Sequence, residues 1–293
     1  MKTTGKTNGI SAVILLALST LFMLITGCGE QSPPTVLVPM FDETSSFCEI
    51  SGIWDSSKDT AKVAVNRLRP GDWVMVMGVD HQGFDDRDVR MNLTQLPKSQ
   101  LPSLKAKQDI MAAISDLQIR PTSSGYPREE PDPVTGAKTK GTPSGTDTIG
   151  VLHYVGTILD SPVFHNSYIR IIIFTDFQEE PPEQYKRQTG ASYSYERVFN
   201  GDCRVMGLNV ITVSDDELIG SETSLDQDEL NMTGEESYML RTRAWTEILN
   251  SMGLQCDETD FHTEAASKAE VVDIYLDGWM RPVASTWKTA GRQ

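Results

Sequence analysis

A carboxylate and two hydroxyls follow an apolar run near the start of the chain, in a spacing that suits a metal ion. Asp42 is followed by Thr44 at i+2 and Ser46 at i+4. A loop at the end of a strand can turn one carboxylate and two hydroxyls at this spacing toward a single point. Ligands of this oxygen-only kind suit a hard cation such as Mg²⁺ or Mn²⁺, which keeps several of its waters. The segment therefore predicts part of a divalent-cation site.

Two further oxygen-bearing residues stand where they could complete such a site. Thr146 precedes an apolar helical pattern, and Asp176 ends the most apolar strand-like run of the chain, 169–175. In a doubly wound sheet, ligands bind at the carboxyl ends of the strands. We expect Asp42, Thr146 and Asp176 to meet at that edge. The alternative is that Asp42 and Ser46 cap the first helix and Thr146 the third, because Ser, Thr and Asp are preferred N-caps.

The cysteines and histidines do not predict a zinc site. The sequence has no CxxC spacing and no HExxH, and its four histidines are scattered. Cys203 precedes an expected strand and Cys256 follows an expected helix, so both are predicted at the amino ends of the strands. Cys48 lies near the metal loop at the other edge. We therefore expect a Cys203–Cys256 disulfide, provided that their Cα atoms come within about 7 Å.

The elements that must position these residues alternate along the chain. Short apolar runs bounded by turn residues predict buried strands, and apolar residues at i, i+3, i+4 and i+7 predict helices. The strands are expected at 35–41, 72–79, 91–94, 169–175 and 208–213, and the apolar helix faces at 61–68, 110–117, 151–159, 245–252 and 265–276, the last capped by Gly278. This alternation predicts an α/β fold with a doubly wound, mostly parallel sheet and helices on both faces.

Three long polar segments interrupt this pattern, at 121–145, 177–202 and 215–236. Loops of this length inside a compact domain are usually functional or disordered. The last two follow the carboxyl ends of strands, so they are expected to border the site. The acidic segment 215–236 is interpreted as a solvated loop, and the alternative is that it supplies further metal ligands.

The amino-terminal residues predict export. Lysines precede an apolar run over 10–25, which is too short to span a bilayer, and Ile25-Thr26-Gly27-Cys28 resembles a bacterial lipobox. The resemblance implies a signal peptide at 1–27, acylation (palmitate) of Cys28, a linker at 28–34 and a location in the bacterial cell envelope, at the outer membrane if the cell has one. The alternative is an ordinary signal peptide in which Cys28 is incidental.

The charge of the chain excludes one class of partner. The formal net charge is −15, and cleavage after residue 27 would remove two lysines and make it more negative still. Such a surface repels polyphosphate, so no nucleic-acid partner is expected. Contact with the membrane is expected through the lipid anchor alone.

Taken together, the three site elements resemble the metal-ion-dependent adhesion site of von Willebrand factor A-type domains. That pattern is D-x-S-x-S after the first strand, a threonine in a later loop, and the aspartate of a T-D-G element. Asp42, Thr44 and Ser46 match the first element, Thr146 the second and Asp176 the third. The resemblance covers 35–281, with a tail at 282–293.

The resemblance implies different roles for these residues in binding the ion. Thr44 and Ser46 would bind the ion directly, Thr146 directly or through water, and Asp42 and Asp176 mainly through bound waters. One open position would accept an acidic side chain of a protein ligand. Thr44 stands where serine is commoner, and Phe177 replaces the glycine after Asp176, which is expected to reshape the loop.

The function predicted from these observations is a lipid-anchored, Mg²⁺- or Mn²⁺-dependent protein-binding module of the adhesion type, and not an enzyme. No nucleophile or His-containing dyad accompanies the oxygen cluster in the sequence. The alternative is a scaffold subunit of an envelope or secretion assembly, with a structural metal or none. A metal-dependent hydrolase ranks third.

Overall fold

The computed structural model describes residues 32–43, 47, 52–79, 89–118, 129–131, 138–140, 148–177, 196–210, 234–263 and 266–281. The chain divides into two units, Met1–Pro33 and Pro34–Gln293, and every element described below belongs to the second. Several residues singled out above lie outside the described residues, namely Cys28, Thr44, Ser46, Cys48 and Thr146. None of the described helices is long and apolar enough to cross a membrane.

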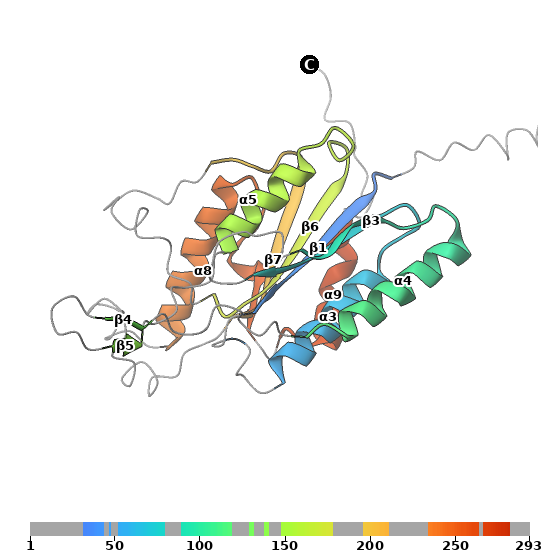
Figure 1. Cartoon of the computed structure of the whole chain (residues 1–293). Coiled ribbons are helices and arrows are strands. Elements are labelled where there is room, and N and C mark those ends of the chain that lie inside the picture. The colour runs from blue at the N-terminus through green and yellow to red at the C-terminus, as the bar shows by residue number, and fades with distance from the viewer. Residues whose placement is uncertain are drawn as a thin grey trace, which may run out of the picture. The chain divides into compact units, whose positions relative to one another are not determined.

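A six-stranded sheet forms the centre of the second unit (Figure 1). From one edge to the other its strands are β3 (Val89–Gln95), β2 (Trp73–Val79), β1 (Thr35–Asp42), β6 (Tyr168–Phe174), β7 (Asp202–Val210) and β8 (Phe261–Thr263). Every neighbouring pair is parallel except β2 and β3, which are antiparallel. The predicted α/β fold with a mostly parallel, doubly wound sheet is confirmed.

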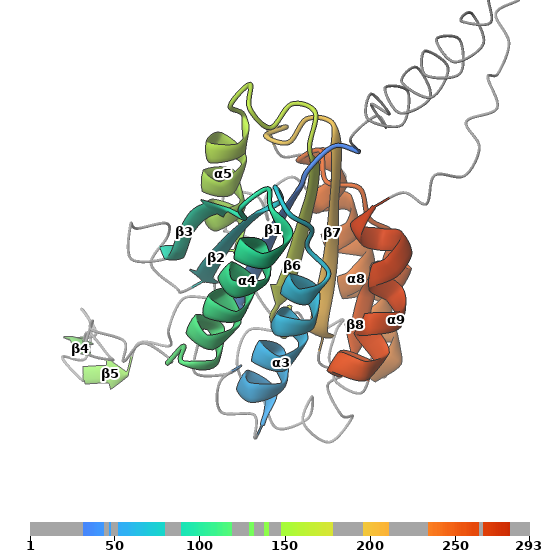
Figure 2. The ribbon, with the colours of Figure 1, turned by 90° about the vertical axis from the view of Figure 1, so that its right-hand side faces the viewer.

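Helices cover both faces of the sheet (Figures 1 and 2). On one face lie α5 (Thr148–Leu159) and α8 (Gly234–Ser251), and on the other lie α3 (Ile53–Asn66), α4 (Gln100–Ser115) and α9 (Ala269–Met280). Alternate residues of β1 enter the two cores: Met40 packs with the first pair of helices, and Phe41 packs with the second group. Burial from both sides explains why the strand is apolar without alternation.

The strand order reverses between β1 and β6. The crossover through α3 leads from β1 to β2, on one side of β1, whereas β6, β7 and β8 follow one another on the other side. Open α/β sheets bind ligands outside the carboxyl ends of the strands at such a reversal. Asp42 is the last residue of β1, and Asp176 follows β6 closely.

Several boundaries differ from the expected ones. β7 begins at Asp202, earlier than the expected 208–213, because its first half alternates polar and apolar residues and so lacks a continuous apolar run. Gly278 lies inside α9, and Arg281 is the C-cap. Four short elements were not expected, namely β8, the paired strands β4 (Glu129–Pro131) and β5 (Lys138–Lys140), and the 3₁₀ helix Glu258–Asp260.

Two buried arginines fasten the end of α9 to the amino edge of the sheet. Arg170 of β6 is fully buried, donates to the carbonyl oxygen of Trp279 at 2.6 Å and pairs with Asp202 at 2.9 Å. Arg281 pairs with Asp72, whose other carboxylate oxygen accepts from the Thr35 N–H at 2.8 Å. Burial of Arg170 lowers its pKa, and Asp202 opposes that shift.

The disulfide predicted between Cys203 and Cys256 is not formed. Both are free thiols. The topology does bring them to the same edge, because the N–H of Gln255 donates to the carbonyl oxygen of Cys203 at 2.7 Å. The Cys203 thiol instead donates to the carbonyl oxygen of Asn200 at 3.1 Å. Cys203 is thus a buried core residue rather than half of a crosslink.

Candidate metal centre

Two of the predicted site residues, Asp42 and Asp176, lie at neighbouring strand ends. The register of β1 and β6 pairs Phe41 with Phe174, so each aspartate follows its strand's last paired residue closely. Asp42 is fully buried, and Asp176 is 3% exposed. Burying two carboxylates close to a core is costly unless hydrogen bonds or a cation compensate the charge. The strand-end placement predicted for both residues is confirmed.

The hydroxyl of Thr175 connects the two strand ends. Its Oγ1 donates a hydrogen bond of 2.6 Å to Oδ2 of Asp42, and it accepts from the backbone N–H of Phe177 at 3.2 Å. The N–H of Thr175 continues the sheet ladder by donating to the carbonyl oxygen of Leu208 at 3.2 Å. Thr175 therefore fixes the rotation of the Asp42 carboxylate from a backbone position that the sheet itself holds.

Phe177, which stands where the resembling pattern has glycine, adopts a backbone conformation that favours glycine. Its φ is 55°, in the left-handed region. This conformation costs a residue with a Cβ about 1–2 kcal/mol. Its side chain is 1% exposed, and burial of a phenylalanine contributes about 1.5–3 kcal/mol. The burial of the ring is thus large enough to offset the strain of the backbone.

The ring of Phe177 is enclosed by aromatic residues. It meets Trp245 of α8 and Phe261 of β8 edge to face, with both centroid distances at 5.3 Å. Gly207 of β7 leaves the space into which Phe177 and Phe261 fit. The loop after β6 is therefore anchored to α8, β7 and β8 at once.

A third buried acid lies beside the site, and the sequence pattern did not predict its burial. Glu43 is 4% exposed, and its Oε1 lies 3.2 Å from Nε of Arg90 on β3. Its N–H also donates to the carbonyl oxygen of Val79 at 2.8 Å, which extends the pairing of β1 with β2 past Asp42. Glu43 and Arg90 are far apart in the sequence. Their ion pair can therefore be recognised only from the order of the strands in the sheet.

A buried polar cluster holds the amino half of α3 near this edge. Asn209 of β7, with φ 67°, donates through its amide side chain to Ser57 of α3 at 2.8 Å. Its N–H donates to Oγ of Ser267 at 2.7 Å, and the Ser267 carbonyl oxygen accepts from Thr60 of α3 at 2.9 Å. Asparagine tolerates the left-handed region better than most residues. These bonds fix α3 relative to β7.

The first residues of α3 and α5 test the alternative that the predicted site residues are helix N-caps. α3 begins at Ile53 with Gly52 as its N-cap, and no side chain caps it. Gly52, and not Asp42, is therefore the cap of α3. α5 begins at Thr148, shortly after Thr146. The hydroxyls of Thr44, Ser46 and Thr146 lie outside the described residues, so their roles stay predictions.

The described residues fit a divalent cation in charge and in donor chemistry. Asp42 and Asp176 supply oxygen atoms and negative charge at one edge, and Thr175 orients one of the carboxylates. Among the residues that the structure describes, no three His, Cys, Asp or Glu side chains come together in a way that could hold a metal ion. The predicted site is of another kind, since it takes hydroxyls as its remaining ligands.

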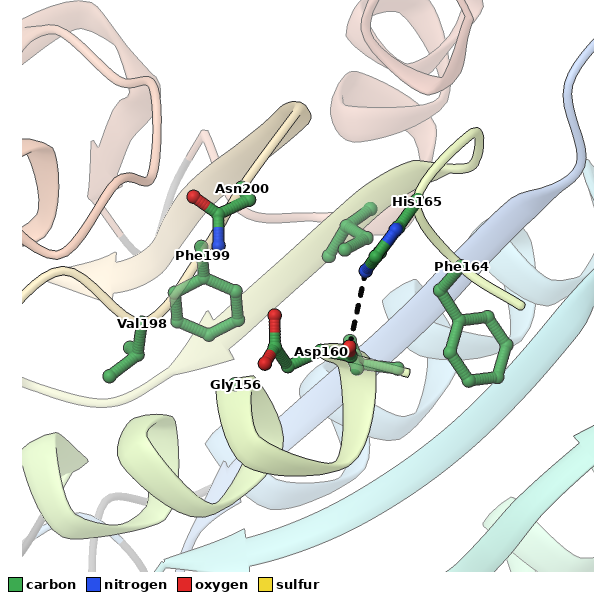
Figure 3. Close-up of a pocket in the computed structure, with 9 residues that line it drawn as sticks. Gly156, Asp160, Phe164, His165, Val198, Phe199 and Asn200 are labelled. Carbon is green, nitrogen blue, oxygen red and sulfur yellow. Dashed lines mark hydrogen bonds between the residues drawn. The ribbon is translucent and has the colours of Figure 1, made fainter. Parts of the chain in front are cut away.

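A small cavity at the amino edge offers no comparable chemistry. It lies between the end of α5 and the segments before β6 and β7, with an apolar floor that includes Phe164 and Phe199 (Figure 3). At its rim, Nε2 of His165 is 3.2 Å from the carbonyl oxygen of Asp160. The buried carboxylates at the opposite edge are the stronger candidate.

Comparison with known proteins supplies structural matches only. No protein-family model and no curated protein matches the sequence. The chain is similar to proximal thread matrix protein 1 from the mussel byssus, at 13% identity over 85% of this chain and 48% of the other, with a TM-score of 0.41. Another structure of that protein is described as having a zinc-occupied MIDAS motif.

Two further matches come from bacteria. A von Willebrand factor type A structure from Catenulispora acidiphila is 13% identical over 85% of this chain and 43% of the other, with a TM-score of 0.39. The pilus adhesin SpaC from Lactobacillus rhamnosus GG is 15% identical over 85% of this chain and 30% of the other, with a TM-score of 0.42. The chain spans about half the length of the first of these proteins, and less of the others.

Proposed function

We propose that this chain is an extracytoplasmic binding module that engages a protein ligand through a divalent cation at the carboxyl edge of its sheet. The observation that carries the proposal is the pair of buried acids, Asp42 and Asp176, at the reversal of strand order, with Thr175 hydrogen-bonded to Asp42. The two carboxylates bring oxygen donors and negative charge to one edge of the sheet. A bound Mg²⁺ or Mn²⁺ would compensate their charge.

Five residues would hold the ion. The hydroxyls of Thr44 and Ser46 would bind it directly, and that of Thr146 directly or through water. Asp42 and Asp176 would fix the bound waters and supply the negative charge. The ion would supply an open position that accepts a carboxylate, so the partner is expected to present an Asp or Glu side chain.

The proposal assigns binding rather than catalysis. Neutral hydroxyl ligands leave most of the charge of the ion available to an incoming carboxylate. The acidic character of the chain disfavours a phosphate-bearing ligand in solution. A protein with an exposed acidic side chain, presented at short range, is the ligand class that the site supports best.

Capture from solubilised envelopes tests this proposal. The chain is immobilised and exposed to the extract in Mg²⁺ or in EDTA, with Asp42→Asn as the matched variant. The expected result is a partner that is retained in Mg²⁺, lost in EDTA and absent with Asp42→Asn. A partner that binds equally in all three conditions would contradict the metal-dependent function and favour the scaffold alternative.

We further propose that lipid on Cys28 holds the module at the membrane. The lipobox-like sequence that ends at Cys28 supports it. The variant Cys28→Ala should then be exported without lipid and be recovered in the soluble fraction. Retention of that variant in the membrane fraction at the level of the unaltered chain would contradict the anchor.

A further inference from the structure

The loop after β6 combines a strained backbone with a buried anchor. Phe177 takes a left-handed conformation that residues with a Cβ rarely adopt, at the point where the resembling family has glycine. Strained conformations of this kind persist only where the surroundings over-determine them. The enclosure of the Phe177 ring by Trp245 and Phe261, each at 5.3 Å, supplies that constraint.

The same residue begins a chain of hydrogen bonds that ends at the candidate metal centre. The N–H of Phe177 donates to Oγ1 of Thr175 at 3.2 Å. A threonine hydroxyl has one hydrogen, and the hydrogen of Thr175 points to Oδ2 of Asp42 at 2.6 Å. The acceptor side of the hydroxyl is held by Phe177, so its donor side is directed at the carboxylate.

The N–H of Phe177 lies in the peptide plane that joins this residue to Asp176, and it closes a turn on the Thr175 hydroxyl. The φ of 55° sets the direction of the side chain from that peptide and places the ring against Trp245 and Phe261. Without the buried ring this peptide would be free to turn its N–H away from Thr175. The hydroxyl would then be free to rotate, and the Asp42 carboxylate would lose a fixed partner.

We propose that Phe177 is a positioning residue of the metal centre, whose buried ring holds the backbone conformation from which its own N–H orients Thr175, and through Thr175 the carboxylate of Asp42. Its effect on the ion would be exerted through Thr175. Residues that orient metal ligands typically change metal affinity by about 10–100-fold when they are replaced. This inference rests on the proposed metal-dependent function.

The test measures Mn²⁺ affinity by calorimetry in the full chain and in three variants. Thr175→Val keeps the shape of the side chain and removes the hydroxyl, and should weaken binding about tenfold or more. Phe177→Ala removes the buried ring, so the peptide before it should move and binding should weaken similarly. The third variant combines Thr175→Val with Phe177→Ala.

The double variant separates positioning from packing. If Phe177 acts on the metal centre through Thr175, Phe177→Ala should weaken Mn²⁺ binding in the unaltered chain and weaken it little further in Thr175→Val. A role in packing alone predicts the same loss in both chains. Phe164→Leu is the matched control, because Phe164 is also buried against an aromatic ring, Trp73 at 5.3 Å, but lies at the opposite edge. It should lower the melting temperature and leave Mn²⁺ affinity unchanged.

The outcomes distinguish the two proposals. Absence of Mn²⁺ binding by the unaltered chain would contradict the proposed function itself. Binding by the unaltered chain together with undiminished binding by Thr175→Val would overturn the positioning role and leave the function intact. Thr175→Val decides the matter even where Phe177→Ala does not fold, because valine and threonine have the same shape.

Discussion

A Cβ atom on Gly207 would lie 2.8 Å from the ring of Phe177, which is closer than real Cβ atoms approach their neighbours. The same atom would lie 2.6 Å from the ring of Phe261. Gly207 is therefore required by the space that the two rings take up on β7. Gly207, in the middle of β7, thus determines whether the ring of Phe177 can be buried and the loop that carries Asp176 held in place.

Gly207→Ala should destabilise the fold. Adding a methyl group to a filled core forces side chains and backbone to shift, at a cost of about 1–3 kcal/mol in the free energy of unfolding. Gly278→Ala in α9 is the control, because nothing lies within 4 Å of its Cβ position. There alanine should stabilise the helix by up to about 1 kcal/mol. Urea unfolding that gave the two variants the same stability would contradict the packing described for Phe177.

The fold could be predicted from the sequence because its strands are buried on both faces. A run such as 35–41 or 169–175 is nearly all apolar, and the helices between the runs each carry one apolar face. β8 was not predicted because a strand of three residues is too short to show an apolar or alternating pattern. The start of β7 escaped because Asp202 and Arg204 interrupt the apolar sequence.

The candidate site could be predicted in part. Asp42 and Asp176 were placed correctly because each directly ends an apolar run, and parallel strands bring such ends to one edge. The bond from Thr175 to Asp42 and the ion pair of Glu43 with Arg90 could not be predicted, because both depend on which strands are neighbours. Sequence spacing identifies residue types at strand ends, whereas contacts across the sheet require its order.

Stability should fall as the pH drops below the ordinary pKa of histidine. Burial lowers the pKa of His262, whose ring stacks on Tyr275 with centroids 5.0 Å apart. The unfolded chain binds a proton near pH 6.5 and the folded chain only at lower pH, so protonation favours unfolding between these two values. His262→Gln should lose this contribution. Urea unfolding at about pH 7.5 and pH 5.5 measures it, and an equal pH dependence in both chains would refute it.

The two described cysteines should react slowly with alkylating reagents in the folded chain. Burial raises the pKa of Cys203 to about 11 and that of Cys256 to about 12. Only the thiolate is nucleophilic, so at about pH 8 little of either thiol can react. Peptide mapping after treatment with iodoacetamide should find both cysteines modified rapidly in urea and slowly without it. Fast labelling of the folded chain, or a peptide crosslinked through either cysteine, would contradict this assignment.

The residues of the metal centre should contribute unequally to cation affinity. Asp176→Ala removes formal negative charge and should abolish divalent-ion binding, with the fold largely intact. Thr146→Ala removes a neutral hydroxyl, which a water can replace, and should weaken binding less. Calorimetric titration with Mn²⁺ measures both variants. A loss at Thr146 as large as that at Asp176 would show that charge does not dominate the site.

Thermal unfolding with and without a divalent cation tests the metal centre most directly. Only the folded chain would bind the ion, so a concentration one hundred times the dissociation constant should stabilise it by about 2.7 kcal/mol. After treatment with a chelator, saturating Mg²⁺ or Mn²⁺ should raise the melting temperature of the unaltered chain by several degrees and leave that of Asp42→Ala unchanged. A melting temperature of the unaltered chain that neither cation raises would contradict the metal-dependent account.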